Sequence, residues 1–318
     1  MIGMKAQILT ATLLTAFSGS LSAADPQLMN LVMPDAKVLA GVNVEQAKGT
    51  QFGQFVLNQL QTHDAQMQQL VALTGFDPRR DVSELLVAFD GMAGSRTGLA
   101  LARGNFDITK ITAAATLAGV VTEVYKGFTI LEDPKNQHAG IAFLDPTRVA
   151  AGDIASVKGA IDRLKTPQPL PVAVTVKVNL WSLSDAWGIT TVPPDSMVPA
   201  GQGAQNPMFN AGKSVQAAAG GVKFGALVVF SGEAKCDTEQ NAKTLGDMIQ
   251  LLINMAQMQA NLDPTAAALI KSVNLTTSGN LMNIKASLPQ DVFQQLLQQA
   301  HKKAETSGMG MGVQPRKR

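Results

Sequence analysis

The sequence predicts an α+β protein in which antiparallel, meandering sheets carry helices on one face, arranged as two similar tandem halves. Short β-branched or Leu-rich runs alternate with segments of helical periodicity along the whole chain. Glycine-containing turns at Lys126-Gly127 and Ser278-Gly279-Asn280 separate apolar runs, a pattern typical of β-hairpins. The order strand, helix, hairpin, helix occurs twice. Because hairpins join antiparallel neighbours, this order favours an α+β fold over a doubly wound parallel sheet.

Residues 1–24 have the pattern of a secretory signal peptide. Lys5 supplies one positive charge, residues 6–17 are uncharged and largely apolar, and the small residues 22–24 follow. This order is what the export machinery and signal peptidase recognise. We therefore expect cleavage after position 24, which leaves a mature chain that begins at Asp25 and functions in the periplasm or outside the cell.

The rest of the 318-residue chain has the composition of a globular protein, with room for one large or two ordinary domains. After the signal segment, no apolar run approaches the ~20 residues that a membrane span needs. Cys236 has no second cysteine to pair with, so no internal disulfide can form. The formal net charge of +2 at pH 7 selects no charged partner, and we expect no binding to nucleic acid.

The first half is predicted to span residues 25–165. Alternating β-branched and Leu-rich residues predict its strands, while apolar residues at helical spacing predict its helices. The expected strands are 38–44, 82–89, 97–103, 121–125, 128–131 and 140–144. The expected helices are 50–60, 63–73, 108–118 and 154–164, of which the last two follow the capping residues Asp107 and Asp153.

Residues 166–172 are the predicted linker because they hold three prolines. The second half, 173–304, partly repeats the first. Two pairs of segments correspond in pattern: 98–107 with 225–237, each a strand followed by a helix cap, and 42–44 with 178–180, each the end of a strand.

The second half closes with elements that have clear local signals. Asp237 and Gln240 form a capping-box pattern at the start of a long helix. The remaining expected elements are hairpin strands 273–277 and 281–286, a last helix from Pro289, a long loop at 191–215 and a disordered basic tail at 305–318.

Four short motifs occur in order over about residues 33–165. They are P-D-A at 34–36, G-x-D-P at 75–78, G-x-F-D at 104–107 and Y-x-G at 125–127. With these motifs the chain resembles a family of uncharacterised exported bacterial proteins. The resemblance implies a bacterial protein associated with the cell envelope, and it supplies no catalytic residue.

The sequence contains no residue set that commits it to a reaction. His63, His138 and His301 lie far from one another and from Cys236, whereas metal sites usually show a local pair of ligands. The chain also lacks the G-x-S-x-G pattern of a nucleophile elbow. We therefore expect no metal and no cofactor, and favour a protein that is not an enzyme. A Ser-His-Asp triad from scattered positions stays an alternative, because such triads are defined by geometry.

Four residues are candidates for ligand binding. In one extended strand Trp181, Leu183 and Trp187 would share a face, where exposed rings would stack on a sugar or an apolar ligand. Met248 and Met255 would line an adaptable apolar groove. For all four, packing in a core is the competing interpretation.

Cys236 is a candidate reactive thiol. It lies between Lys235 and the expected helix start at Asp237, and a thiol at a helix N-terminus beside a lysine has a lowered pKa. The competing interpretation is a small apolar residue that closes a strand.

Taken as a whole, the sequence predicts an exported, non-enzymatic protein with a binding or structural role at the envelope. Its expected partner is a protein or a small apolar ligand. The alternatives are a hydrolase with a dispersed triad and a carrier of an apolar ligand.

Overall fold

The computed structural model describes most of the chain. The described residues are 24–51, 53–54, 71–92, 94–95, 97–133, 136–193, 196, 212–259 and 264–295. The signal segment up to position 23, most of the two helices expected between 50 and 73, most of the expected loop 191–215 and the tail 305–318 lie outside these residues.

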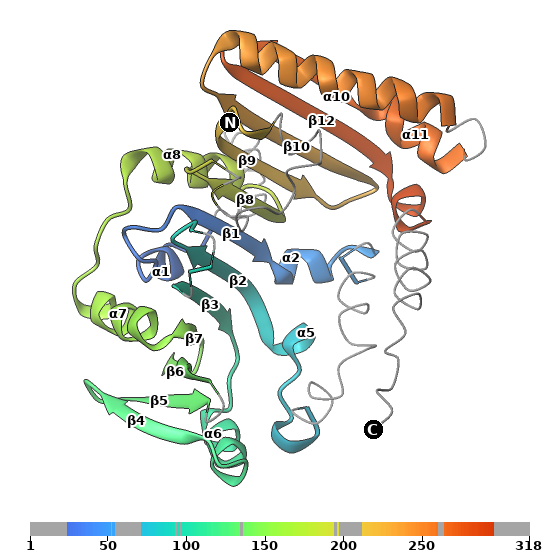
Figure 1. Cartoon of the computed structure of the whole chain (residues 1–318). Coiled ribbons are helices and arrows are strands. Elements are labelled where there is room, and N and C mark those ends of the chain that lie inside the picture. The colour runs from blue at the N-terminus through green and yellow to red at the C-terminus, as the bar shows by residue number, and fades with distance from the viewer. Residues whose placement is uncertain are drawn as a thin grey trace, which may run out of the picture.

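The described strands form a single antiparallel sheet (Figure 1). Its order is β11-β12-β10-β9-β8-β1-β2-β3-β7-β6-β5-β4, and each neighbouring pair is antiparallel. The strands are β1 (Val38–Asn43), β2 (Val82–Phe89), β3 (Gly98–Gly104), β4 (Val121–Tyr125), β5 (Phe128–Asp133), β6 (Asn136–Asp145), β7 (Arg148–Asp153), β8 (Ala186–Thr190), β9 (Val215–Lys223), β10 (Leu227–Cys236), β11 (Asn274–Ser278) and β12 (Leu281–Pro289). The α+β class is confirmed. The sequence predicted separate sheets, whereas the described strands form one continuous sheet.

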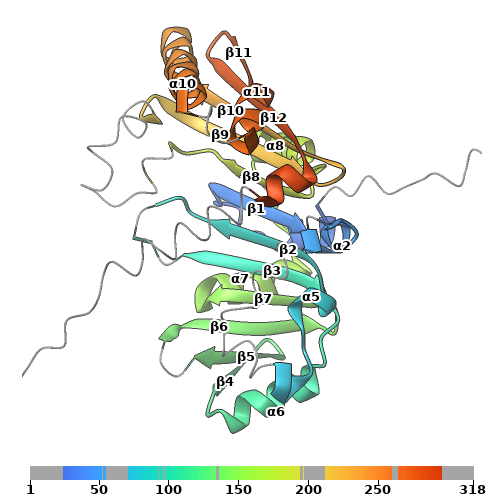
Figure 2. The ribbon, with the colours of Figure 1, turned by 90° about the vertical axis from the view of Figure 1, so that its right-hand side faces the viewer.

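Pairing of β1 with β8 joins the two parts of the sheet. Leu39 lies opposite Ile189, and Gly41 lies opposite Trp187. Strands from the first half of the sequence lie on one side of this seam, and strands from the second half lie on the other (Figure 2). The seam is therefore the only sheet pairing between the two halves among the described strands.

The first described helix precedes β1, and the others lie between strands in the sequence. They are α1 (Pro26–Met29), α2 (Val44–Lys48), α5 (Pro78–Asp81), α6 (Ile108–Leu117), α7 (Ile154–Lys165), α8 (Val172–Trp181), α10 (Glu239–Gln259) and α11 (Pro264–Ser272). The predicted caps of α6 and α7 are confirmed, because Asp107 accepts a hydrogen bond from Lys110 N (3.1 Å) and Asp153 accepts one from Ser156 N (2.9 Å). The predicted cap of α10 is one residue early: Thr238 Oγ1 accepts from Asn241 N at 3.1 Å.

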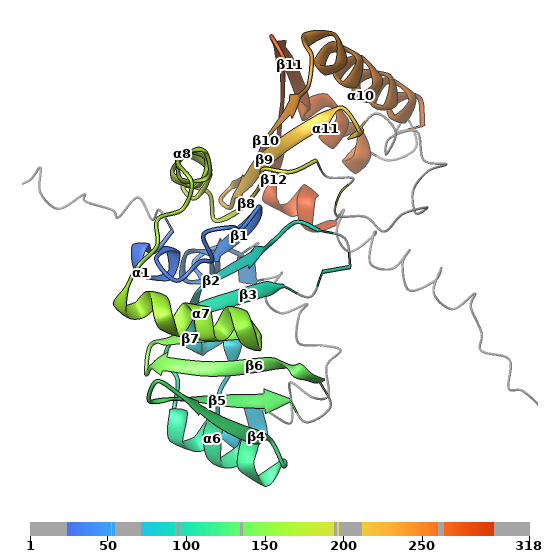
Figure 3. The same cartoon turned by 60° about the vertical axis from the view of Figure 1, so that its left-hand side comes forward.

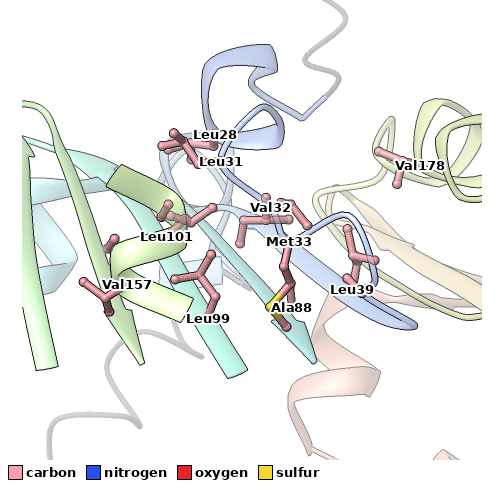
Figure 4. Close-up of a cluster of buried hydrophobic side chains, with 14 of the residues drawn as sticks. Leu28, Leu31, Val32, Met33, Leu39, Ala88, Leu99, Leu101, Val157 and Val178 are labelled. Carbon is pink, nitrogen blue, oxygen red and sulfur yellow. The ribbon is translucent and has the colours of Figure 1, made fainter. Parts of the chain in front are cut away.

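A large core lies on one face of the sheet, under α1, α7 and α8. In Figure 4, Leu28 and Leu31 lie close to Leu101 of β3, and Val157 of α7 lies beside Leu99. All of these side chains are buried, and the same cluster continues across the seam to Ile189 and Ala219. This core therefore contains side chains from both halves.

A smaller core lies on the opposite face, under α10. It contains Ala234 and Met282 of the sheet with Ala242 and Leu245 of the helix. The register fixes the face: Met282 lies opposite Ala234 and Ala234 opposite Ala218, whose side chain points away from that of Ala219. Helices thus pack on both faces of the sheet: Figure 3 shows α7 and α8 on one face and α10 and α11 on the other. The sheet as a whole therefore does not carry its helices on one face.

The expected strand end at 178–180 is wrong, because these residues lie in α8. The Val-rich segment has high β-propensity, but Val174 and Val178 lie four residues apart and are both buried. Burial of this i, i+4 pair outweighs a propensity that depends strongly on context. The predicted linker consequently ends at Pro171, directly before α8.

Candidate functional site

Trp181 and Trp187 do not lie in one strand, the arrangement in which their rings would share a face for a ligand. Trp181 is the last residue of α8, whereas Trp187 lies in β8. The Trp187 ring covers Gly41 of β1 so closely that a Cβ at Gly41 would lie 2.6 Å from the indole nitrogen. Trp187 is buried in the large core, and Trp181 packs against that core. Both rings are therefore packing residues of the seam.

The turn between α8 and β8 encloses three polar atoms that have no hydrogen-bond partner among the described residues. They are Trp181 Nε1, Ser182 Oγ and Asp185 Oδ1. Desolvation raises the pKa of the Asp185 carboxyl, although its other oxygen accepts a hydrogen bond from Phe224 N. The main-chain oxygen of Asp185 also accepts a hydrogen bond from Asn43 N (2.8 Å), and the Asp185 N–H donates to Val222 O (2.9 Å). The turn thus ties β1, β8 and β9 together, and no sequence pattern identified it.

The outer side of α8 carries an exposed apolar stripe. Val172, Val176 and Leu180 are 79%, 61% and 59% exposed, and their spacing of four residues places them on one side of the helix. Leu183, in the following turn, is also exposed. We call these four residues the α8 stripe. The buried side of the helix is apolar as well, and Thr175 and Asn179 are the polar residues among its exposed ones.

The positive charge on α8 is neutralised by a carboxylate of the sheet. Lys177 is the single charged residue of the helix, and its ammonium forms an ion pair with Glu233 of β10. This pair fixes α8 against the sheet. It also directs the Lys177 side chain toward the sheet, so that most of that side chain is covered. The α8 stripe thus lies on the exposed side of an anchored helix and contains no charged side chain.

Met248 and Met255 lie on α10, but they do not form a groove between helix and sheet. Leu245 and Ile249 contact the small core, while Met248 is half-buried. Met255 is exposed, as are the apolar residues around it: Leu251, Leu252 and Met258. The C-terminal part of α10 therefore has apolar side chains at the surface.

Cys236 is buried, and its Sγ lies 3.9 Å from Ser214 Oγ. Burial raises the pKa of the thiol, which is the opposite of the lowered pKa that the sequence predicted. The side chain belongs to the small core with Ala242 and Leu245. The geometry favours the interpretation of Cys236 as an apolar residue that closes β10.

A cavity of about 370 Å³ lies beside α5 and the start of α6. It is lined by Thr74, Gly75, Phe76, Arg80, Asp81, Asn105, Asp107 and Lys110. Its cations are paired, Arg80 with Asp81 (2.7 Å) and Lys110 with Asp107 (2.9 Å). A polar, charge-balanced cavity does not fit an apolar ligand, and the candidate methionines do not line it.

The G-x-D-P and G-x-F-D motifs meet at this cavity and explain its shape. Asp77 N donates to Asp81 Oδ2 (2.8 Å), and Asn105 N donates to Asp81 O (2.7 Å). Phe76 and Phe106 pack with ring centroids 5.6 Å apart. Both motifs therefore serve the local structure through turn hydrogen bonds and ring packing.

The described residues contain no cluster of metal-binding groups. None of them forms a group of three or more His, Cys, Asp or Glu side chains able to hold a metal ion. His138 lies exposed in β6, while His63 and His301 fall outside the described residues. None of the described helices has both the length and the apolar character needed to cross a membrane.

Comparison with known proteins shows a likeness of fold. No family model matches the chain, and no curated protein matches its sequence. A solved structure, crystal form I of TP0453, superposes with a TM-score of 0.50 at 10% sequence identity. The match covers 87% of this chain and 98% of that one. At this identity the likeness bears on the arrangement of helices and strands alone.

Proposed function

We propose that the chain is an exported protein of the bacterial envelope with a non-enzymatic binding role, and that the α8 stripe binds a partner protein. Export is supported by the signal-peptide pattern of residues 1–24, and bacterial origin by the family resemblance of residues 33–165. The binding role is supported by the exposed apolar surface of α8.

The α8 stripe carries this proposal. Its anchors at 172, 176 and 180 have the spacing with which an amphipathic helix enters the groove of another protein. Small apolar ligands bind in concave sites, whereas these side chains lie on the exposed side of a helix and line no part of the cavity beside α5, so a protein is the better partner. Covering the exposed part of each of these side chains contributes roughly 1–2 kcal/mol before the costs of association.

In-cell crosslinking tests the α8 stripe. A photo-crosslinking residue at position 176 is expected to give a discrete adduct with a second protein, and Leu180→Asp is expected to abolish that adduct. The matched control places the crosslinker at Leu117 of α6, which is more exposed than any residue of the stripe. Equal labelling from both positions, or no adduct from position 176, would contradict the proposal.

Export is tested separately. Residues 1–24, fused to a reporter enzyme that becomes active only after export, are expected to give activity. Leu14→Arg places a charge within the apolar segment and is expected to remove that activity. A reporter that stays inactive with the unaltered segment would contradict export.

We also propose that the sheet arose from two tandem units. β1-β2-β3 and β8-β9-β10 are both three-stranded meanders. After the third strand of each, the chain forms a helix, reaches the outer edge of the sheet and returns to place its last strand beside the third: β7 beside β3, and β12 beside β10. The first unit differs by one additional hairpin. Many related sequences would check this, since true repeats align segment 98–107 with 225–237 better than with shifted positions.

A further inference from the structure

The most informative contact outside α8 is at Asp25, where the predicted mature chain begins. The backbone N–H of Asp25 donates to Glu84 Oε1 at 2.9 Å. Its carboxylate forms an ion pair with Arg103 and also accepts from Gln27 N at 2.7 Å. Asp25 is therefore held at β2 and β3 through both its main chain and its side chain.

Glu84 is incompletely compensated in this cluster. It lies in β2 beside Arg103 of β3 and is partly buried. Desolvation raises the pKa of its carboxyl and outweighs the hydrogen bond from Asp25 N, which lowers it, while the Asp25 carboxylate adds a smaller raising effect. Among the described residues, Arg103 is the cation that acts on Glu84, and Arg148, opposite it on β7, pairs with Asp145 at 2.6 Å. With Asp25 in a peptide bond, two carboxylates share one guanidinium.

Cleavage after Ala24 supplies the missing charge. Signal peptidase adds water across the Ala24–Asp25 bond, which leaves a carboxylate on Ala24 and an amine on Asp25. That amine takes up a proton, since an α-amino group has a pKa of about 7.7–8.0 and a nearby carboxylate favours its charged form. The new ammonium then occupies the position from which Asp25 N already contacts Glu84.

We infer that Glu84 is the binding site for the mature N-terminal ammonium of Asp25, and that this ion pair locks α1 onto β2 and β3. The inference rests on the proposed export and adds to it that cleavage occurs after Ala24. The resulting cluster holds two carboxylates and two cations, and its new bond is charge-assisted. One additional residue at the N-terminus moves the ammonium up to ~3.6 Å along the chain, beyond hydrogen-bond reach of Glu84.

The first measurement is the N-terminal sequence of the exported protein. Asp25 as first residue supports the inference. An exported chain that begins elsewhere overturns the inference and leaves the proposed function standing. A chain that is not exported overturns the proposed function itself.

The second measurement compares chains that begin at Asp25 with chains that begin at Ala24, each with Glu84 and with Glu84→Gln. In each background, the folding equilibrium constant of the chain that begins at Asp25 is divided by that of the chain that begins at Ala24. This ratio is expected to be roughly tenfold larger with Glu84 than in E84Q. Comparing the two backgrounds cancels the packing lost with Ala24, which contacts the large core. Glu45→Gln, an exposed carboxylate on α2, is the control and is expected to leave the ratio unchanged.

Selective acylation of the α-amine gives a readout that does not depend on stability. In the folded chain that begins at Asp25, acylation is expected to be about tenfold slower than in E84Q, because pairing keeps the amine protonated. Equal acylation rates in the two chains, with Asp25 confirmed as first residue, would overturn the inference.

Discussion

The large core and the small core lie on opposite faces of the sheet, and they differ in how much of the chain contributes to them. The large core collects side chains from α1 at the start of the chain, from β1 to β3, from α7 and α8, and from β8 and β9 beyond the predicted linker. The small core contains only side chains from residue 215 onward. The comparison shows that the first half depends on the second for its core, whereas the second half has a core of its own.

Leu101→Ala should give the largest effect. Leu101 is fully buried in the large core, and its truncation leaves a cavity among α1, β2 and β3, so we expect a loss of about 2–5 kcal/mol in the free energy of unfolding. Urea denaturation of the variant measures it. Leu117→Ala on the exposed side of α6 is the control and should change stability by less than about 0.5 kcal/mol. Similar losses at both positions would disprove the difference in burial.

Leu245→Ala should affect the second half alone. Leu245 belongs to the small core and is slightly exposed, so we expect a loss of ~2 kcal/mol. Native-state hydrogen exchange should show faster opening of β11 and β12, with β2 and β3 still protected. If β2 and β3 opened equally, the two cores would be one cooperative unit and the comparison would fail.

Gly41→Ala tests the seam where the two halves meet. Its Cβ would overlap the Trp187 ring, so the ring must shift, at a cost of about 1–3 kcal/mol. Gly188→Ala is a matched control on β8, because the nearest atoms to its Cβ are 3.8 Å away. The thermal midpoint of G41A should fall and that of G188A should change little. An equal fall in both midpoints would show that the strands tolerate no added Cβ at either position, and that contact with the Trp187 ring is not the cause.

Asp185→Asn should give the smallest effect, visible as a change in pH dependence. The folded-state pKa of Asp185 is raised by desolvation, so the folded chain holds this proton more tightly than the unfolded chain. Stability from Asp185 is therefore present below its ordinary pKa of 3.8 and is lost as pH rises through the raised value. D185N should remove this decline in urea midpoints measured across that range, whereas the exposed Asp247→Asn should keep it. A decline that persists in D185N would mean that another group causes it.

Local signals predicted the fold well where a few neighbouring residues decide the structure. The hairpin turns at Gly127 and Gly279 have positive φ, which glycine adopts without strain, and both hairpins are confirmed. The capping aspartates at 107 and 153 likewise act within one helical turn. These turns and caps are determined by a few neighbouring residues, so they could be predicted from the sequence.

Features that depend on distant contacts could not be predicted in this way. The pairing of β1 with β8 decides which face of the second half continues the large core, and neither strand encodes its partner. The Val-rich α8 has the composition of a strand and becomes a helix because its buried valines meet that core. The burial of Asp185, and the raised pKa of Cys236, are likewise consequences of three-dimensional packing.

The seam also sets the order in which the molecule can form. Val38, in one of the first strands synthesised, has its partner at Thr190, so one edge of β1 stays unpaired until the chain is made well past the predicted linker. Closing so long a loop before any contact compensates for it makes folding slow. During that delay the unpaired edge of β1 is open to pairing with another molecule, and a chaperone that covers this edge would protect the nascent chain.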